Sequence, residues 1–196
     1  RADSNIQTLD DLSGHTVSIG AEESGTERNA TQILEFAGMP SSLVATKNLD
    51  YIEATKELKA GDIDAFFCTA GLTTTVIDEL SKECDIRLIP LTDTVISKML
   101  ESSSAYTSEV IPAGTYTGQD TAISTIGVKS VLITKSDVSD DTIEQLTSLL
   151  FEKENELSYS NSLKLELTYD FATDGIPIPF HNGAKRYYED CGYSIN

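Results

Sequence analysis

The sequence predicts an α/β protein with a mostly parallel sheet that is flanked by helices. In the first half of the chain, short apolar runs typical of strands alternate with stretches whose apolar residues have helical spacing. The connections between them are short, and such alternation favours parallel strands with helices on the faces of the sheet. Hydrophobic residues form 39% of the 196 residues, which is enough for a core and too many for a disordered chain.

Four strands are expected, with one helix after each of the first three. The strands are Thr16–Ile19, Leu43–Thr46, Ile63–Phe67 and Ile86–Leu91. The helices are Ser24–Ala37, Tyr51–Leu58 and Thr73–Lys82. In the first helix Ala30, Ile33 and Leu34 have the spacing of one helix face, and Gly38 ends the helix. Asp50 is placed to cap the second helix, which ends at Gly61.

The pattern is looser in the second half of the chain. Residues 103–119 are rich in Ser, Thr, Gly and Pro and predict an irregular passage. The expected elements are a helix over Asp93–Ser102, strand-like pieces at Ile126–Val128 and Val131–Ile133, a helix that follows Asp137 and includes Ile143 and Leu150, and a last helix over Ala184–Cys191. The acidic residues from Asp137 to Asp141 complement the N-terminal end of a helix dipole, so they predict a solvated helix start.

Charge and cysteine content exclude several classes of function. The chain has 14 Lys and Arg against 32 Asp and Glu, a formal net charge of −18 at pH 7, which makes nucleic acid and anionic membrane poor partners. With His15 and His181 as the sole histidines, no metal site is expected, and no cofactor is expected either. Cys68, Cys84 and Cys191 are an odd number without a CxxC motif, so they predict neither a disulfide framework nor a zinc site. A bridge between Cys84 and Cys191 stays open.

The turn after the first strand is the first candidate site. Ser24, Gly25 and Thr26 lie between that strand and the first helix, where a helix N-terminus offers N–H groups to an anion. The alternative is structural: Ser24 and Glu27 have the spacing of a capping box, and on spacing alone this is the better interpretation. Because Glu27 brings a negative charge, a small carboxylate or a zwitterion fits this turn better than phosphate.

The turn after the third strand is the second candidate. Thr69, Ala70 and Gly71 precede the third helix, so this turn falls on the same edge of a parallel sheet as Ser24. Two small polar turns on one edge form one wall of a cleft. An ordinary connection between strand and helix is the alternative.

Several segments together resemble one family. They are Asp11–Gly14, Gly20–Leu34, Ala54–Phe67, Thr69–Gly71, Ile111–Gln119 and Pro179–Gly192. In order and spacing they are similar to the TAXI family of solute-binding proteins, the extracytoplasmic receptors of TRAP transporters. Leu72 and Asn182 depart from this pattern, because the family usually has Pro at both places. The family also has an N-terminal half-lobe before the segment that corresponds to Asp11.

The resemblance implies a periplasmic-binding-protein-like fold of two hinged lobes that close on a small organic acid or amino acid, without catalysis. It implies an extracytoplasmic location, in the periplasm or as a cell-surface lipoprotein, and the membrane components of a TRAP transporter as partners. Residues 9–115 would then form mainly one α/β lobe. Residues 116–196 would hold a hinge crossing and the returning, incomplete part of the other lobe. Tyr116 would contact the ligand from near the hinge.

The opening Arg1-Ala2-Asp3-Ser4-Asn5 reads as the lead-in of a longer chain. A sheet that lacks strands exposes an edge, so homodimerisation through that edge is expected. Two other functions stay open. One is a small hydrolase or transferase with Ser24 or Cys68 as nucleophile and His181 as base, although GxSxG and HExxH motifs are absent. The other is a cytoplasmic effector-binding regulatory domain.

Overall fold

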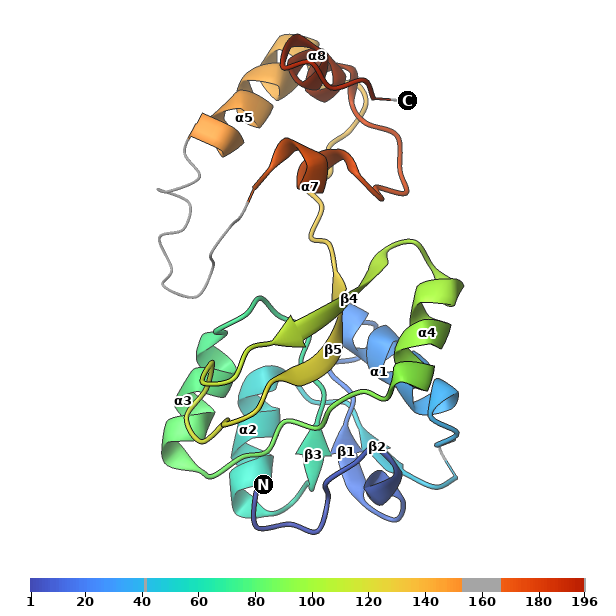
Figure 1. Cartoon of the computed structure of the whole chain (residues 1–196), viewed down its shortest axis with the longest axis vertical. Helices are drawn as coiled ribbons and strands as arrows, with labels where there is room; N and C mark the ends of the chain where they lie inside the picture. The colour runs from blue at the N-terminus through green and yellow to red at the C-terminus, as the bar shows by residue number, and fades with distance from the viewer. Residues whose placement is uncertain (41, 153–166, 196) are drawn as a thin grey trace. The chain divides into compact units, whose positions relative to one another are not determined.

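The computed structural model describes residues 1–40, 42–152 and 167–195 (Figure 1). The chain divides into two compact units, Arg1–Gly127 and Val128–Asn196. The first unit holds both candidate turns.

A three-stranded sheet forms the centre of the first unit. Its strands are β1 (Thr16–Ser18), β2 (Ala45–Lys47) and β3 (Ala65–Phe66), in the order β2-β1-β3. Both neighbours pair with β1 in parallel, and Val17 lies opposite Thr46 on one side and Ala65 on the other. The predicted α/β class with a parallel sheet and flanking helices is therefore confirmed.

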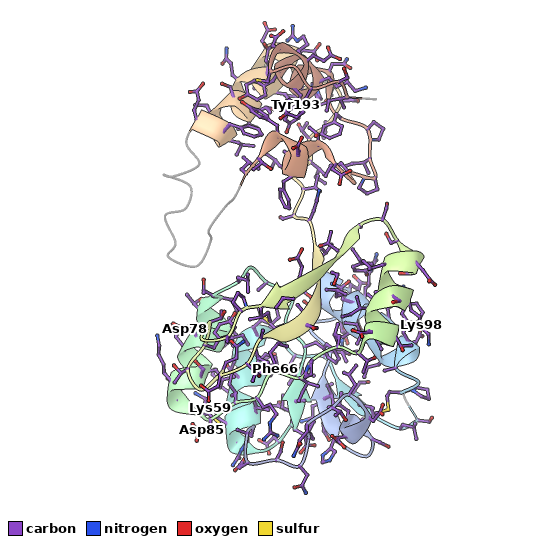
Figure 2. The ribbon with its side chains drawn as sticks, viewed as in Figure 1. Lys59, Phe66, Asp78, Asp85, Lys98 and Tyr193 are labelled. Carbon is purple, nitrogen blue, oxygen red and sulfur yellow. The ribbon has the colours of Figure 1, made fainter. Side chains whose placement is uncertain are left out.

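Helices cover both faces of this sheet. They are α1 (Gly25–Phe36), α2 (Tyr51–Ala60), α3 (Thr75–Glu83) and α4 (Asp93–Ser102), and a 3₁₀ turn spans Asp10–Leu12. Figure 1 shows α1 close to α4, and α2 close to α3. Val17 belongs to one buried cluster with Ile33, Leu34 and Met99, whereas Phe66, labelled in Figure 2, packs against the second cluster of Ala54, Leu58, Ile63 and Leu80. Because successive side chains of a strand point to opposite faces of the sheet, the sheet separates two cores.

Side-chain caps begin the first two helices as the sequence predicts. The Ser24 hydroxyl accepts a hydrogen bond from the Glu27 N–H at 3.1 Å. Asp50 and Glu53 form a reciprocal capping box at the start of α2. Gly61 ends α2 in the left-handed conformation, at φ 83°. These caps fix where the connections that precede each helix must end.

A second sheet differs from the prediction. It pairs β4 (Tyr106–Ile111) with β5 (Ile123–Val128), although residues 103–119 were expected to be irregular. The expected strand at Ile86–Leu91 is wrong, because this segment has no strand structure; Leu91 N–H donates to Ser124 O at 2.9 Å. Its apolar side chains pack into the two cores, so its hydrophobicity reports burial rather than strand pairing.

Helices dominate the second unit. It contains α5 (Asp140–Glu152), α7 (Tyr169–Thr173) and α8 (Asn182–Asp190), with α5 packed on α8. An aromatic cluster joins them: Tyr169 stacks on Phe151 at 4.5 Å between centroids and contacts Tyr193, labelled in Figure 2, at 5.0 Å. The strand expected at Val131–Ile133 is wrong, because the segment has no strand structure, and Leu132 and Ile133 are 68% and 73% exposed.

Within the three described stretches, no helix has both the length and the hydrophobicity needed to cross a bilayer. Cys68, Cys84 and Cys191 are all free thiols in the structure.

Candidate functional site

The two candidate turns lie on one edge of the central sheet. β1 and β3 are parallel neighbours, with Ser18 opposite Phe66, so their carboxyl ends are adjacent. The turn after β1 leads into α1, and the turn after β3 leads into α3 (Figure 1). Parallel strands place both exits at the edge where α/β proteins bind ligands. We call the two turns and the first turn of α1 the carboxyl edge.

The turn after β1 is tightly built around Gly20. Its φ of +101° is one that L side chains rarely adopt, and a Cβ at this position would lie 2.8 Å from Thr26 Cβ. Ser24 caps α1, as described above, but Glu27 does not bind the Ser24 N–H that a full capping box requires. Instead Glu27 accepts hydrogen bonds from Glu23 N–H at 2.6 Å and from Asn48 at 2.8 Å. The Glu27 carboxylate is therefore occupied by local donors.

Tyr51, at the start of α2, joins the two turns. Its hydroxyl lies 2.7 Å from Thr26 Oγ1, donates to the Thr69 carbonyl at 2.8 Å and accepts from the Thr69 N–H at 3.1 Å. Thr26 is buried, whereas Thr69 is exposed, as are Ala70 and Gly71. The structure thus brings Thr26 and Thr69 together through one tyrosine.

A second connection runs through Asn29 on α1. Its amide donates to Thr69 Oγ1 at 3.3 Å, and its carbonyl oxygen accepts from the Tyr106 hydroxyl at 2.9 Å. Burial raises the pKa of Tyr106, so its hydroxyl stays protonated and able to donate. The first turn of α1, the Thr69 turn and the start of β4 are therefore linked by polar side chains.

Tyr116 lies beside the start of α3. Burial, the largest cause, raises the pKa of its phenol, and hydrogen bonds with the backbone of Thr74 and Thr73 oppose that rise. Only 7% of Tyr116 is exposed, and its backbone N–H donates to Gln119 Oε1 at 3.3 Å. Of the seven predicted site residues, Thr26 and Thr69 are the two that form hydrogen bonds with Tyr51.

The geometry weakens the nucleophilic alternative. Burial raises the pKa of Cys68 to about 11, with side-chain hydrogen bonding to Tyr51 acting in the opposite direction, so this thiol is protonated at neutral pH and a poor nucleophile. Ser24 Oγ is used as a cap. His181 belongs to the other unit, where its Nδ1 accepts a hydrogen bond from Gly183 N–H at 3.1 Å and caps α8.

The shifted pKa of Cys68 predicts a loss of stability at alkaline pH. The unfolded thiol ionises near its ordinary value of 9.0, but the folded one near 11, so above pH 9 the unfolded state binds fewer protons. The free energy of unfolding should fall between pH 9 and 11 by up to about 1.4 kcal/mol per pH unit. Urea titrations at several pH values measure this slope.

Cys68→Ala should remove that part of the slope, because alanine does not titrate. An equal slope in the variant and the wild type would show that ionisation of Cys68 does not cause the loss.

Within the described part of the chain, no group of three or more His, Cys, Asp or Glu side chains could hold a metal ion. The carboxyl edge carries hydroxyls, amides and backbone N–H groups, together with the carboxylates of Glu22, Glu23 and Glu27. Such groups bind a ligand by hydrogen bonds, and a helix N-terminus favours a negative one.

Comparison with known proteins assigns the chain to a family. The model of the NMT1-like family matches residues 1–192. The chain belongs to the NMT1-like family. Among solved structures, this NMT1-like chain is similar to the periplasmic aliphatic sulphonate binding protein SsuA from Escherichia coli, with 14% identity and a TM-score of 0.40. The match covers 95% of this chain and 52% of that protein, so the NMT1-like chain spans about half the length of its solved relative.

Sequence reasoning missed Tyr51, Asn29 and Tyr106. Tyr51 was recognised as a helix residue, but its hydroxyl reaches Thr69, 18 residues away. Tyr106 meets Asn29 across 77 residues. The order of strands and helices predicts which turns share an edge, whereas it carries no signal for which side chain joins them.

Proposed function

We propose that this NMT1-like chain is part of an extracytoplasmic solute-binding receptor, located in the periplasm or held at the cell surface as a lipoprotein. Its solute is a small carboxylate or an amino acid, bound without catalysis. The resemblance of the sequence to the TAXI family supports a TRAP-type transporter as the system that it serves, with the membrane components of that transporter as partners.

One observation carries the proposal: Thr26 and Thr69, from two different turns, meet at Tyr51 on the edge where parallel strands end. The first N–H groups of a helix have no helical carbonyl to bind, so those of Gly25 and Thr26 face the ligand side of α1. Two turns held together offer donors from two directions, which a single helix end does not.

The donors favour a carboxylate. Ser24 Oγ accepts from Glu27 N–H, and Thr69 Oγ1 accepts from Asn29, so each hydroxyl keeps its own proton for another acceptor. The Glu27 carboxylate is occupied by Asn48 and by the backbone. A carboxylate has acceptors only, which complements this set of donors.

We further propose that residues 9–115 are mainly one lobe of the receptor, and that residues 116–196 contain a hinge crossing and the returning part of the other lobe. A solute that contacts both lobes would favour a closed state and exclude water from its polar contacts. Homodimerisation through an open sheet edge stays a prediction that light scattering tests.

Isothermal titration calorimetry with a panel of amino acids and dicarboxylic acids tests the binding function. With a solute that binds, Gly25→Pro should lower the affinity by about 10-fold, because it removes a donor to a charged acceptor. Proline suits this first helical position, and Ser24 before it is already extended, at ψ 158°.

Gly25→Ala is the matched control, since it adds a side chain where no atom lies within 4 Å and keeps the N–H. Equal affinities for the proline variant and the wild type would place the solute elsewhere. Absence of binding across the whole panel would count against the proposed receptor function.

A further inference from the structure

We propose that the Tyr51 hydroxyl is the anchor that positions the Thr69 turn for solute binding. The inference rests on the proposed function and assigns a positioning residue to that site. It starts from exposed residues of the turn between β3 and α3 that have no backbone–backbone hydrogen bonds of their own in the described chain. Thr69, Ala70, Gly71 and Leu72 are all exposed, and in the described chain none of them forms a backbone–backbone hydrogen bond.

Tyr51 supplies what the turn lacks. Its hydroxyl binds both backbone groups of Thr69, accepting from the N–H at 3.1 Å and donating to the carbonyl at 2.8 Å. One side chain therefore fixes the orientation of the Thr69 backbone, and with it the direction of the two residues that follow. Asn29 adds a longer bond of 3.3 Å to the Thr69 side chain alone.

The hydroxyl protons available to Tyr51 and Thr26 also determine which of the two donates to the other. The Tyr51 hydroxyl has one proton, which the Thr69 carbonyl receives. The 2.7 Å contact between Thr26 Oγ1 and the Tyr51 oxygen must then be donated by Thr26. Because its hydroxyl proton is used inside the protein, Thr26 offers a solute its backbone N–H and not its hydroxyl proton.

Tyr51 itself is placed by the helix that it starts. It follows the Asp50 cap of α2, whose capping box fixes the first turn of that helix. Ala54 and Leu58, on the same helix, are buried in the second core. The anchor thus belongs to a rigid element, whereas the turn that it holds does not.

Hydrogen exchange of the Thr69–Leu72 amides in wild-type protein, Tyr51→Phe and Tyr106→Phe tests the anchor. Phenylalanine keeps the ring and removes the hydroxyl, so exchange of the Thr69 N–H, the amide of this turn that Tyr51 binds, should be about 10-fold faster in Tyr51→Phe, the effect of losing one to two net hydrogen bonds. Tyr106→Phe makes the same change in the same unit and removes a bond to Asn29 without touching the Thr69 backbone. Its exchange should match that of the wild type.

Solute affinity separates a positioning role from a merely structural one. With a solute found by calorimetry, Tyr51→Phe should weaken binding by about 10-fold while the urea midpoint changes little. Thr26→Val removes one partner of Tyr51 and neither bond to Thr69, so its exchange at Thr69–Leu72 should stay near the wild-type rate.

Unchanged exchange in Tyr51→Phe, or faster exchange with unchanged affinity, would overturn the anchor while the receptor function stands. If no solute binds and the exchange pattern is as expected, the receptor function fails and the anchoring of the turn stands. Should Tyr51→Phe not fold, hydrogen exchange of the wild-type protein alone tests the anchor. The Thr69 N–H, which Tyr51 binds, must exchange more slowly than the N–H groups of Ala70 and Gly71. Equal rates would contradict the anchor.

Discussion

Replacing Gly183 with alanine should destabilise the second unit by about 2–3 kcal/mol, because the new methyl group has no space. Gly183 is a buried residue in the first turn of α8, where this helix packs on α5. A Cβ at this position would overlap the Asp140 carbonyl oxygen and lie 2.9 Å from Glu144 N. These are backbone atoms, so no side-chain rotation relieves the overlap and the two helices must separate.

Thermal or urea unfolding followed by circular dichroism measures this loss. Gly25→Ala is the matched control: it also adds a methyl near a helix start, but in open space, and should change stability by less than about 1 kcal/mol. Equal stability of the Gly183 variant and the control would mean that α5 and α8 are not packed as closely as described.

Replacing Gly20 with alanine should cost the first unit about 2–4 kcal/mol and disturb the carboxyl edge as well. Two penalties add: a positive φ of 101° that L residues rarely adopt, and a Cβ placed 2.8 Å from Thr26 Cβ and 3.0 Å from Ser24 Oγ. Because Thr26 lies in the first turn of α1 and Ser24 caps that helix, the strain falls on residues of the proposed solute site. Urea unfolding measures the loss, and calorimetry measures the accompanying fall in solute affinity.

Gly14→Ala separates the two penalties. Gly14 also has a positive φ, of 81°, but no atom lies within 4 Å of its Cβ, so this variant carries the conformational cost alone, about 1 kcal/mol. If Gly14→Ala and Gly20→Ala lost equal stability, the close approach of Thr26 to Gly20 would contribute nothing.

Local patterns predicted the parts of the fold that local forces determine. The helix expected over Ser24–Ala37 is α1, Gly25–Phe36, because the apolar spacing and the Ser24 cap act within a few residues. The parallel strands β1, β2 and β3 follow from alternation of strands and helices along the chain. The adjacency of the two turns follows from that topology.

Partners distant in sequence could not be predicted. The apolar run Ile86–Leu91 was interpreted as a strand, because short apolar runs do not distinguish strand pairing from burial. β4 was missed because the Ser- and Thr-rich residues that form it have no apolar alternation. Their strand conformation depends on pairing with β5, which lies further along the chain. The contacts of Tyr51 with Thr26 and Thr69 likewise exist only once α2 is folded against the sheet.

The most direct test of the carboxyl edge as a solute site is an NMR titration of the ¹⁵N-labelled protein with the amino acids and dicarboxylic acids of the calorimetry panel. Saturable shifts of the Gly25, Thr26, Ala70 and Gly71 amides, with smaller changes elsewhere, are the predicted result. A solute that binds and shifts other amides, while these four stay in place, would contradict the account.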